Sequence, residues 1–145
     1  MNKYWFIFIL GSLLSFSHLV KASEQENNSK VFVIKNSQNS TKKITKSQLR
    51  NIFLGRNTLT FEPVIPPQET LSRIIFNMKI IGLNESRIQS FYAQMRFSGR
   101  ARPPKEFATT EKLLEYVANT INAISYVPSD SQLPHNVEII YIITN

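Results

Sequence analysis

The densest group of residues able to bind an anion is a run of cations between positions 96 and 105. Arg96, Arg100, Arg102 and Lys105 fall within ten residues, beside Ser98. A guanidinium can donate two parallel hydrogen bonds to a phosphate or carboxylate, and a loop just past a helix can present several such groups. The same cations also suit the negative end of a helix dipole. Two interpretations therefore stay open: contact with an anionic ligand or acidic partner, and ordinary helix termination.

Hydroxyl groups supply further candidate anion contacts in two places. Thr70 lies in the first turn of a helix expected over residues 68–80, where backbone N–H groups attract anions, although the adjacent Glu69 could itself be the resident anion. Ser37 and Ser40 lie in a polar loop after the first expected strand, and ligands of doubly wound α/β folds bind at the carboxyl ends of strands. That loop has no glycine and is equally typical of an ordinary surface loop.

The sequence has few of the side chains that enzymatic catalysis usually requires. Beyond residue 22 the chain holds one histidine, His135, one aspartate, Asp130, and no cysteine. A serine nucleophile would have to come from Ser129 or Ser131 in the same proline-flanked loop, without the rigid placement that catalysis needs. Metal sites need three or four ligands, and one histidine with scattered glutamates does not supply them. We therefore expect no enzyme, no metal and no cofactor.

The N-terminus predicts export. Residues 1–22 read as a signal peptide, with a short basic start, an apolar stretch over 5–20 and a cleavage site after Ala22. A membrane anchor is the weaker alternative, because polar residues leave the stretch short of the roughly 20 apolar residues that span a bilayer. Residues 23–30 are then a flexible mature N-terminus, and residues 31–145 form one domain. We expect a soluble periplasmic protein without a stable membrane anchor.

Composition narrows the classes of partner. The 145-residue chain carries a formal net charge of +7, of which Lys3 and Lys21 would leave with the signal peptide. Without cysteine there is neither a disulfide nor a lipoprotein anchor, so the core alone must hold the fold. The remaining charge is diffuse and no nucleic-acid-reading motif is present, so we expect anionic solutes, anionic lipids or acidic proteins as partners rather than nucleic acid.

Strands alternate with helices along the domain. Thr45 and Gln48 have the spacing of a capping box, and the expected caps of later helices are Asn84 and either Thr109 or Thr110. In the helix over 68–80, the apolar residues at helical spacing predict an inward stripe, which comprises Leu71, Ile74, Ile75 and Met78. The expected strands are 31–34, 63–67, 124–127 and 137–143, the last of them covered on both faces. This order predicts a three-layer α/β lobe with a mainly parallel sheet and helices on both faces.

Four stretches in this order resemble a known family. They are Ser47-Gln-Leu-Arg-Asn-Ile-Phe-Leu-Gly-Arg56, Arg96-Phe-Ser-Gly-Arg100 with Pro103-Pro104, Leu113-Leu-Glu-Tyr-Val117, and Ala123-Ile-Ser-Tyr-Val127. Together they are similar to the periplasmic phosphate-binding proteins of ABC transporters, and most of all to the short, single-lobe phosphate transporter substrate-binding-like members. The resemblance implies one lobe of the type II periplasmic-binding fold.

The departures from that family concern the anion site. Full-length relatives close two lobes around phosphate, whereas residues 31–145 have room for one. Relatives carry an Arg and then a Ser-Gly-Thr turn before the helix that corresponds to 68–80; here Pro66-Pro-Gln-Glu-Thr70 takes that place, and only Thr70 remains as a hydroxyl donor. The resemblance therefore implies the fold but not the familiar high-affinity phosphate site.

Two functions follow as hypotheses. The first is a periplasmic solute-binding-like protein, with weak phosphate or oxyanion binding linked to ABC-type transport. Its candidate anion-binding residues are Thr70, Ser98, Arg100, Arg102, Ser37 and Ser40. The alternative is a non-enzymatic protein–protein interaction module of the cell envelope, built on a degenerate solute-binding lobe. Its candidate partner-binding residues are Arg96, Arg100, Arg102 and Lys105.

Overall fold

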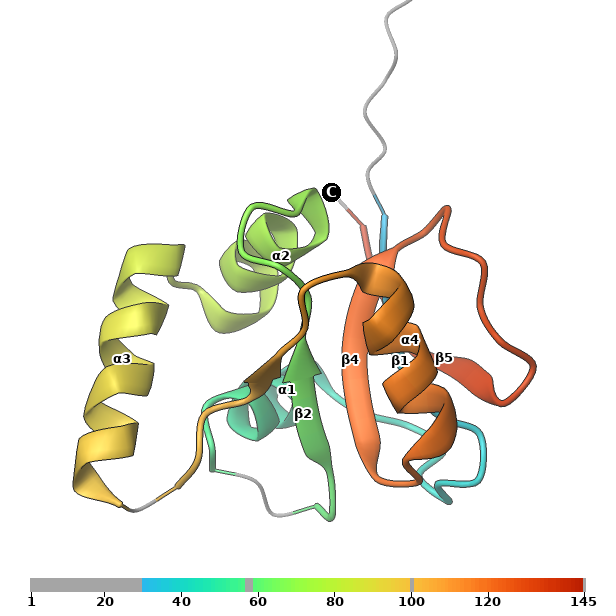
Figure 1. The fold of residues 1–145 in the computed structure, drawn as a ribbon, viewed down its shortest axis with the longest axis horizontal. Helices are drawn as coiled ribbons and strands as arrows, with labels where there is room; N and C mark the ends of the chain where they lie inside the picture. Colours follow the sequence, from blue (N-terminus) through green and yellow to red (C-terminus); the bar gives the residue numbers. More distant parts are fainter. Residues whose placement is uncertain (1–29, 57–58, 100, 145) are drawn as a thin grey trace, which may run out of the picture.

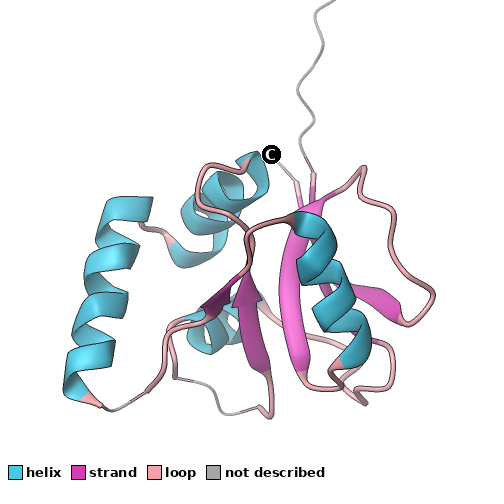
Figure 2. Cartoon of the chain, viewed as in Figure 1, coloured by secondary structure: helices cyan, strands magenta, loops and turns pink. Residues whose placement is uncertain are grey.

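The computed structural model describes residues 30–56, 59–99 and 101–144. The predicted signal peptide, most of the predicted mature N-terminus and Arg100 lie outside the described residues. The described chain forms one five-stranded sheet, with the order β3-β2-β4-β1-β5, together with flanking helices (Figures 1 and 2). The strands are β1 Val31–Asn36, β2 Glu62–Ile65, β3 Lys105–Glu106, β4 Ala123–Pro128 and β5 Val137–Ile143.

The sheet is mixed, so the expectation of a mainly parallel sheet is wrong in part. Strand β2 pairs in parallel with both β3 and β4, but β1 pairs antiparallel with β4 and with β5. The first strand thus runs against the other four. Its carboxyl end consequently lies at the opposite edge of the sheet from the carboxyl ends of β2, β3 and β4.

Helices cover both faces of the sheet, as expected of a three-layer α/β lobe. One core cluster takes Val31 and Val33 from β1 and joins them to buried residues of α1 (Lys46–Phe53), α2 (Leu71–Phe76) and α3 (Glu85–Ser98). A second cluster takes Ile34 from the other face of β1 and packs it with α4 (Thr110–Asn119). Neighbouring residues of β1 enter different cores because successive side chains of a strand point to opposite faces.

The helix caps follow the local sequence signals. Both hydrogen bonds of the predicted capping box between Thr45 and Gln48 are present at α1. The Asn84 side chain accepts a hydrogen bond from the Arg87 N–H at the start of α3, and Thr109 accepts one from the Lys112 N–H at the start of α4. These three predictions are confirmed. The caps could be predicted because a cap depends only on residues three positions apart.

The second helix presents the opposite face from the one expected. It divides into α2 and a π-helical segment, η1 (Asn77–Ile81), and of the predicted inward stripe only Ile75 is buried. The other three residues, Leu71, Ile74 and Met78, are at least half exposed. The helix has a second apolar face, on which Phe76 stacks against Tyr126 with 3.9 Å between ring centroids. The helix packs its Phe76 face against the core, since an aromatic ring buries a large apolar area.

The last strand is also more exposed than expected. Strand β5 is an edge strand that pairs only with β1, and its Ile139 and Ile142 side chains are 40% and 52% exposed. The prediction that β5 is covered on both faces is therefore wrong. A run of apolar residues also forms an edge strand here, since isoleucine suits a pleated surface that is only half buried.

Candidate functional site

The carboxyl ends of β2, β3 and β4 meet at one edge of the sheet, where ligands bind in open α/β folds. Thr70 lies at this edge as the N-cap of α2. Its hydroxyl donates a hydrogen bond to the Pro67 carbonyl oxygen at 2.8 Å and makes no capping bond. The Ser72 side chain is 2% exposed, and its hydroxyl lies 3.5 Å from that of Thr70. Thr70 thus already donates its hydroxyl proton within the chain.

A buried arginine is the main charged group at this edge. Arg73 is 1% exposed and comes from the buried face of α2. Its Nη1 donates to the Pro66 carbonyl at 2.7 Å and lies 3.0 Å from the Glu106 carboxylate at the end of β3. Its Nε and Nη2 donate to the two carboxylate oxygens of Glu85 at 3.0 and 2.5 Å. Arg73 thereby joins the ends of β2 and β3 to the start of α3.

The Glu85 carboxylate occupies a receptor built by four donors. Besides the two from Arg73, Asn77 Nδ2 donates to one oxygen at 2.8 Å and Gln89 Nε2 donates to the other at 2.7 Å. Such an arrangement is what an oxyanion receptor requires. Burial lowers the pKa of Arg73, but the hydrogen bonds that Arg73 donates to Glu85 and Glu106 outweigh this and raise the pKa above its usual value. Two carboxylates against one guanidinium leave this network without a positive charge to offer a ligand.

Two tyrosines lie close enough to Arg73 and Glu85 for these charges to affect their pKa values. Tyr92 donates from its hydroxyl to the Phe53 carbonyl at 3.0 Å, and Tyr126 is 1% exposed. Burial raises the pKa of both hydroxyls well above the usual tyrosine value, and the nearby Arg73 only partly opposes this. Both stay neutral at physiological pH, so they add no charge for or against an anion.

A small hollow of about 310 Å³ opens at the same edge, between the start of α2, the start of β1 and the end of β4. Its size is at the lower end of the range for small-molecule sites. Its lining includes the hydroxyl groups of Ser72 and Ser129, the cation Lys30 and the carboxylate of Asp130. One charge of each sign gives the hollow weak rather than strong selectivity for anions.

The predicted loop residues Ser37 and Ser40 lie elsewhere. Because β1 runs against the other strands, this loop lies at their amino edge, where the Ser37 N–H donates to the Asn136 carbonyl just before β5. Both serines are exposed, and the loop is fixed by Asn36, whose Nδ2 donates to two carbonyls of α4. The structure therefore does not bring Ser37 and Ser40 together with Thr70, and the reason is the direction of β1.

The cationic run from 96 to 105 is spread over several places. Arg102 and Lys105 line a hollow of about 390 Å³ beside Glu62, and Lys105 also lies 4.8 Å above the Phe107 ring. Ser98 lines a separate hollow of about 350 Å³ beyond α3. Arg96 is exposed in the last turn of α3, and Arg100, which was also predicted, lies outside the described residues. None of these described residues shares a hollow with Thr70.

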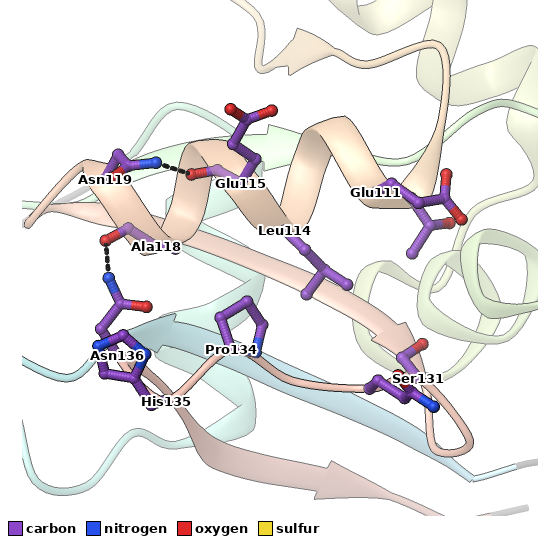
Figure 3. A pocket seen from close by; sticks show the side chains of 11 residues that line it. Glu111, Leu114, Glu115, Ala118, Asn119, Ser131, Pro134, His135 and Asn136 are labelled. Carbon is purple, nitrogen blue, oxygen red and sulfur yellow. Dashed lines mark hydrogen bonds between the residues drawn. The ribbon is translucent and has the colours of Figure 1, made fainter.

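The largest of the hollows that we describe was not anticipated from the sequence. About 680 Å³ in volume, it lies between α4 and the segment 131–136 (Figure 3). Leu114 points into the space between the helix and the loop, whereas the Glu115 carboxylate lies on the side of α4 away from that loop. The sequence carries no local signal for this hollow, because the helix and the loop come together only in the folded chain.

Arg73 is the functional candidate that sequence reasoning missed. The sequence did contain a signal: Arg73 is a charged residue among apolar residues in the expected helix, and the polar Asn77 follows one turn later. Among the described residues, no three His, Cys, Asp or Glu side chains are grouped to hold a metal ion. No helix in the described part of the chain is both long and apolar enough to cross a membrane.

Comparison with known proteins gives the fold its class. No family model matches the chain, and neither does any curated protein. Among solved structures, it is similar to a putative phosphate ABC transporter substrate-binding protein with bound phosphate from Clostridium perfringens, with a TM-score of 0.59 and 16% identity over 77% of this chain. It is also similar to an ABC-type phosphate transport receptor from Vibrio cholerae, with a TM-score of 0.57 and 14% identity, again over 77% of this chain.

The similarity covers less than half of either protein. The chain spans 44% of the Clostridium protein and 45% of the Vibrio protein. At these identities the comparison shows the fold: a lobe of the kind found in phosphate ABC transporter substrate-binding proteins. The resemblance seen in the sequence is confirmed at that level, as is the α/β class.

Proposed function

We propose that this chain is a non-enzymatic interaction module of the cell envelope, built on a solute-binding-like lobe, and that it contacts a protein partner through α2 and η1. In this proposal the chain is exported, its first 22 residues are removed, and the lobe works in the periplasm. The proposal takes the second of the two sequence hypotheses and moves the contact surface from the Arg96–Lys105 run to the helix.

The observation that carries the proposal is an exposed apolar stripe. Leu71, Ile74 and Met78 are 50%, 52% and 59% exposed and are spaced three and four residues apart along α2 and η1. This i, i+3, i+7 pattern is the one by which a helix packs into an apolar groove of a partner. Single exposed apolar residues are normal on a surface, but three in register on one helix form a continuous contact strip.

The charge network argues against a phosphate carrier of the usual kind. Arg73 is the one fully buried guanidinium of the described chain, and it is neutralised by Glu85 and Glu106. This favours a function that does not depend on holding a small anion.

A second candidate rests on the hollow at the carboxyl edge. There Lys30, Ser72 and Ser129 could hold a small oxyanion against the first turn of α2, next to Thr70. Phosphate is bound by the Clostridium protein, as its description states. We propose this as the weaker function, because Asp130 lines the same hollow and opposes an anion.

Two measurements on the exported protein separate the candidates. Calorimetry with inorganic phosphate should give no saturable heat at millimolar ligand if the chain is an interaction module. Co-purification from an envelope extract should recover one dominant partner with the wild type and lose it with Ile74→Asp, while Lys79→Glu, an exposed charge change on the same helix, should retain it. Saturable phosphate heat that Lys30→Glu abolishes, with no partner recovered, would instead support the oxyanion candidate.

A further inference from the structure

A single phenylalanine projects almost completely into solvent at the end of α3. Phe97 is 93% exposed, more than any other large apolar residue of the described chain. It lies in the last turn of α3, two residues before Gly99, and this end of the helix lies at one extreme of the molecule (Figure 1). A Cβ placed at Gly99 would meet no atom within 4 Å, so the backbone beside the ring is also open to solvent. Neither core cluster includes this side chain.

Arg96 precedes Phe97 in the last turn of α3, and Arg102 follows four residues after that helix ends. Together with Arg56 these residues form what we call the Arg/Phe tip: Arg56, Arg96, Phe97 and Arg102. All four are exposed. Arg56 follows α1 and lines the same hollow as Ser98, which places it beside the end of α3. The ion pairs found among the described residues involve Lys35 and Arg73 but none of the tip arginines. Glu62 shares a hollow with Arg102 and accepts a hydrogen bond from Tyr116.

We infer that the Arg/Phe tip docks on an anionic lipid surface. Arginines close to an anionic bilayer are attracted to its headgroups, and an exposed aromatic ring near them can enter the boundary between headgroups and acyl chains. An acidic protein would neutralise the charges of the arginines. However, an aromatic residue that anchors a protein contact is normally surrounded by packed neighbours that exclude water, and Phe97 has no apolar patch around it. A fluid lipid surface does not require such neighbours, because lipid can adapt its shape to a single side chain. Charge complementarity and the isolation of Phe97 together favour lipid.

This inference does not depend on the proposed protein contact. The apolar stripe belongs to α2 and η1, near the carboxyl edge of the sheet, while the tip lies at the end of α3 and beside the amino end of β3. One lobe could therefore rest on a membrane through the tip and leave the stripe free. Each surface has its own variants and its own measurement, so one inference can fail while the other holds.

Co-sedimentation of the exported protein with lipid vesicles tests the inference. We expect binding to vesicles that contain phosphatidylglycerol, loss of binding at high salt, and no binding to pure phosphatidylcholine. Replacing Arg96 or Arg102 with Gln should weaken binding about fivefold each, and Phe97→Ser should weaken it about tenfold, the lower end of the range for burying such a ring. Lys79→Gln and Ile121→Ser, which remove an exposed cation and an exposed apolar residue elsewhere, should bind like the wild type.

A fluorescence measurement identifies the residue that enters the lipid. The chain has one tryptophan, Trp5, which lies in the predicted signal peptide, so Phe97→Trp adds a reporter at the tip. Its emission should shift to shorter wavelength with anionic vesicles and stay constant with neutral ones. The inference is overturned if Phe97→Ser binds as well as the wild type, if millimolar inorganic phosphate displaces the protein as a single-site ligand would, or if vesicles fail to bind while an acidic protein is captured in an Arg96-dependent way.

Discussion

Removing the Glu85 carboxylate should destabilise the lobe strongly, because Glu85 is the main counter-ion of a buried guanidinium. In Glu85→Ala, the Nε and Nη2 groups of Arg73 lose both of their acceptors, and Asn77, which is 5% exposed, loses its partner as well. Arg73 keeps only the Pro66 carbonyl and Glu106.

The expected magnitude follows from burial. Breaking a buried ion pair by removing one partner costs about 3–5 kcal/mol. The Glu85 side chain is 31% exposed. Water can therefore replace part of it, and we expect a loss of about 3 kcal/mol in the free energy of unfolding, the lower end of that range. For a domain of this size such a loss lowers Tm by about 10 °C.

Urea unfolding followed by far-ultraviolet circular dichroism measures this loss. Formate or acetate should restore part of the stability of Glu85→Ala by entering the vacated receptor, and should do nothing for the wild type. The double variant Arg73→Met with Glu85→Met removes both charges together and should be more stable than Glu85→Ala, since an apolar pair of similar size can replace a buried ion pair with little loss. A loss below about 0.5 kcal/mol in Glu85→Ala, the range of ordinary surface substitutions, would refute the reasoning.

Three further predictions concern other parts of the lobe. Glu138 has a lowered pKa because it accepts a hydrogen bond from the buried Lys35. Its contribution to the free energy of unfolding is complete above the pKa that it has in the unfolded chain, and is lost as pH falls through its lower pKa in the folded chain. Glu138→Gln should therefore make stability depend less steeply on pH in acid. Burial raises the pKa of Tyr92, so alkaline absorbance titration should show fewer ionised tyrosines in the native protein than in denaturant. Gly55→Ala should lose more stability than Gly99→Ala in thermal melts. Both glycines have positive φ, but only at Gly55 would the new Cβ lie within 3.2 Å of other side chains, and Gly99→Ala should lose only about 1 kcal/mol.

The sequence predicts the features that depend on near neighbours. The capping box at Thr45 and Gln48 and the caps of α3 and α4 follow from residues within one helical turn. The three-layer class also follows, because the alternation of strands and helices constrains how the apolar faces can be covered. The motifs that resemble phosphate-binding proteins strengthen this prediction, and the similar structures agree with it.

The direction of β1 could not be predicted in this way. Its six residues are apolar or polar in the same pattern whether the strand runs with or against β4, and the pairing joins residues more than 80 positions apart. The position of Ser37 and Ser40 depends entirely on that direction. A correct reading of the local sequence therefore still placed the loop at the wrong edge of the sheet.

The face of α2 was ambiguous for a different reason. The helix carries two apolar faces, one through Leu71, Ile74 and Met78 and one through Ile75 and Phe76. Periodicity cannot choose between them. The choice is made by partners from other elements, because Arg73 reaches Glu85 and Glu106 only when its own face is turned inward. Arg73 was missed as a site residue for this reason.

Site-specific photo-crosslinking in the living source cell tests the central claim most directly. A photoreactive side chain at Ile74 should yield one discrete adduct with a second protein, and the same group at the exposed Lys79 or Glu111 should yield none. Phosphate starvation and excess should leave the adduct unchanged. The account is contradicted if position 74 gives no adduct, or if adducts form equally at all three positions.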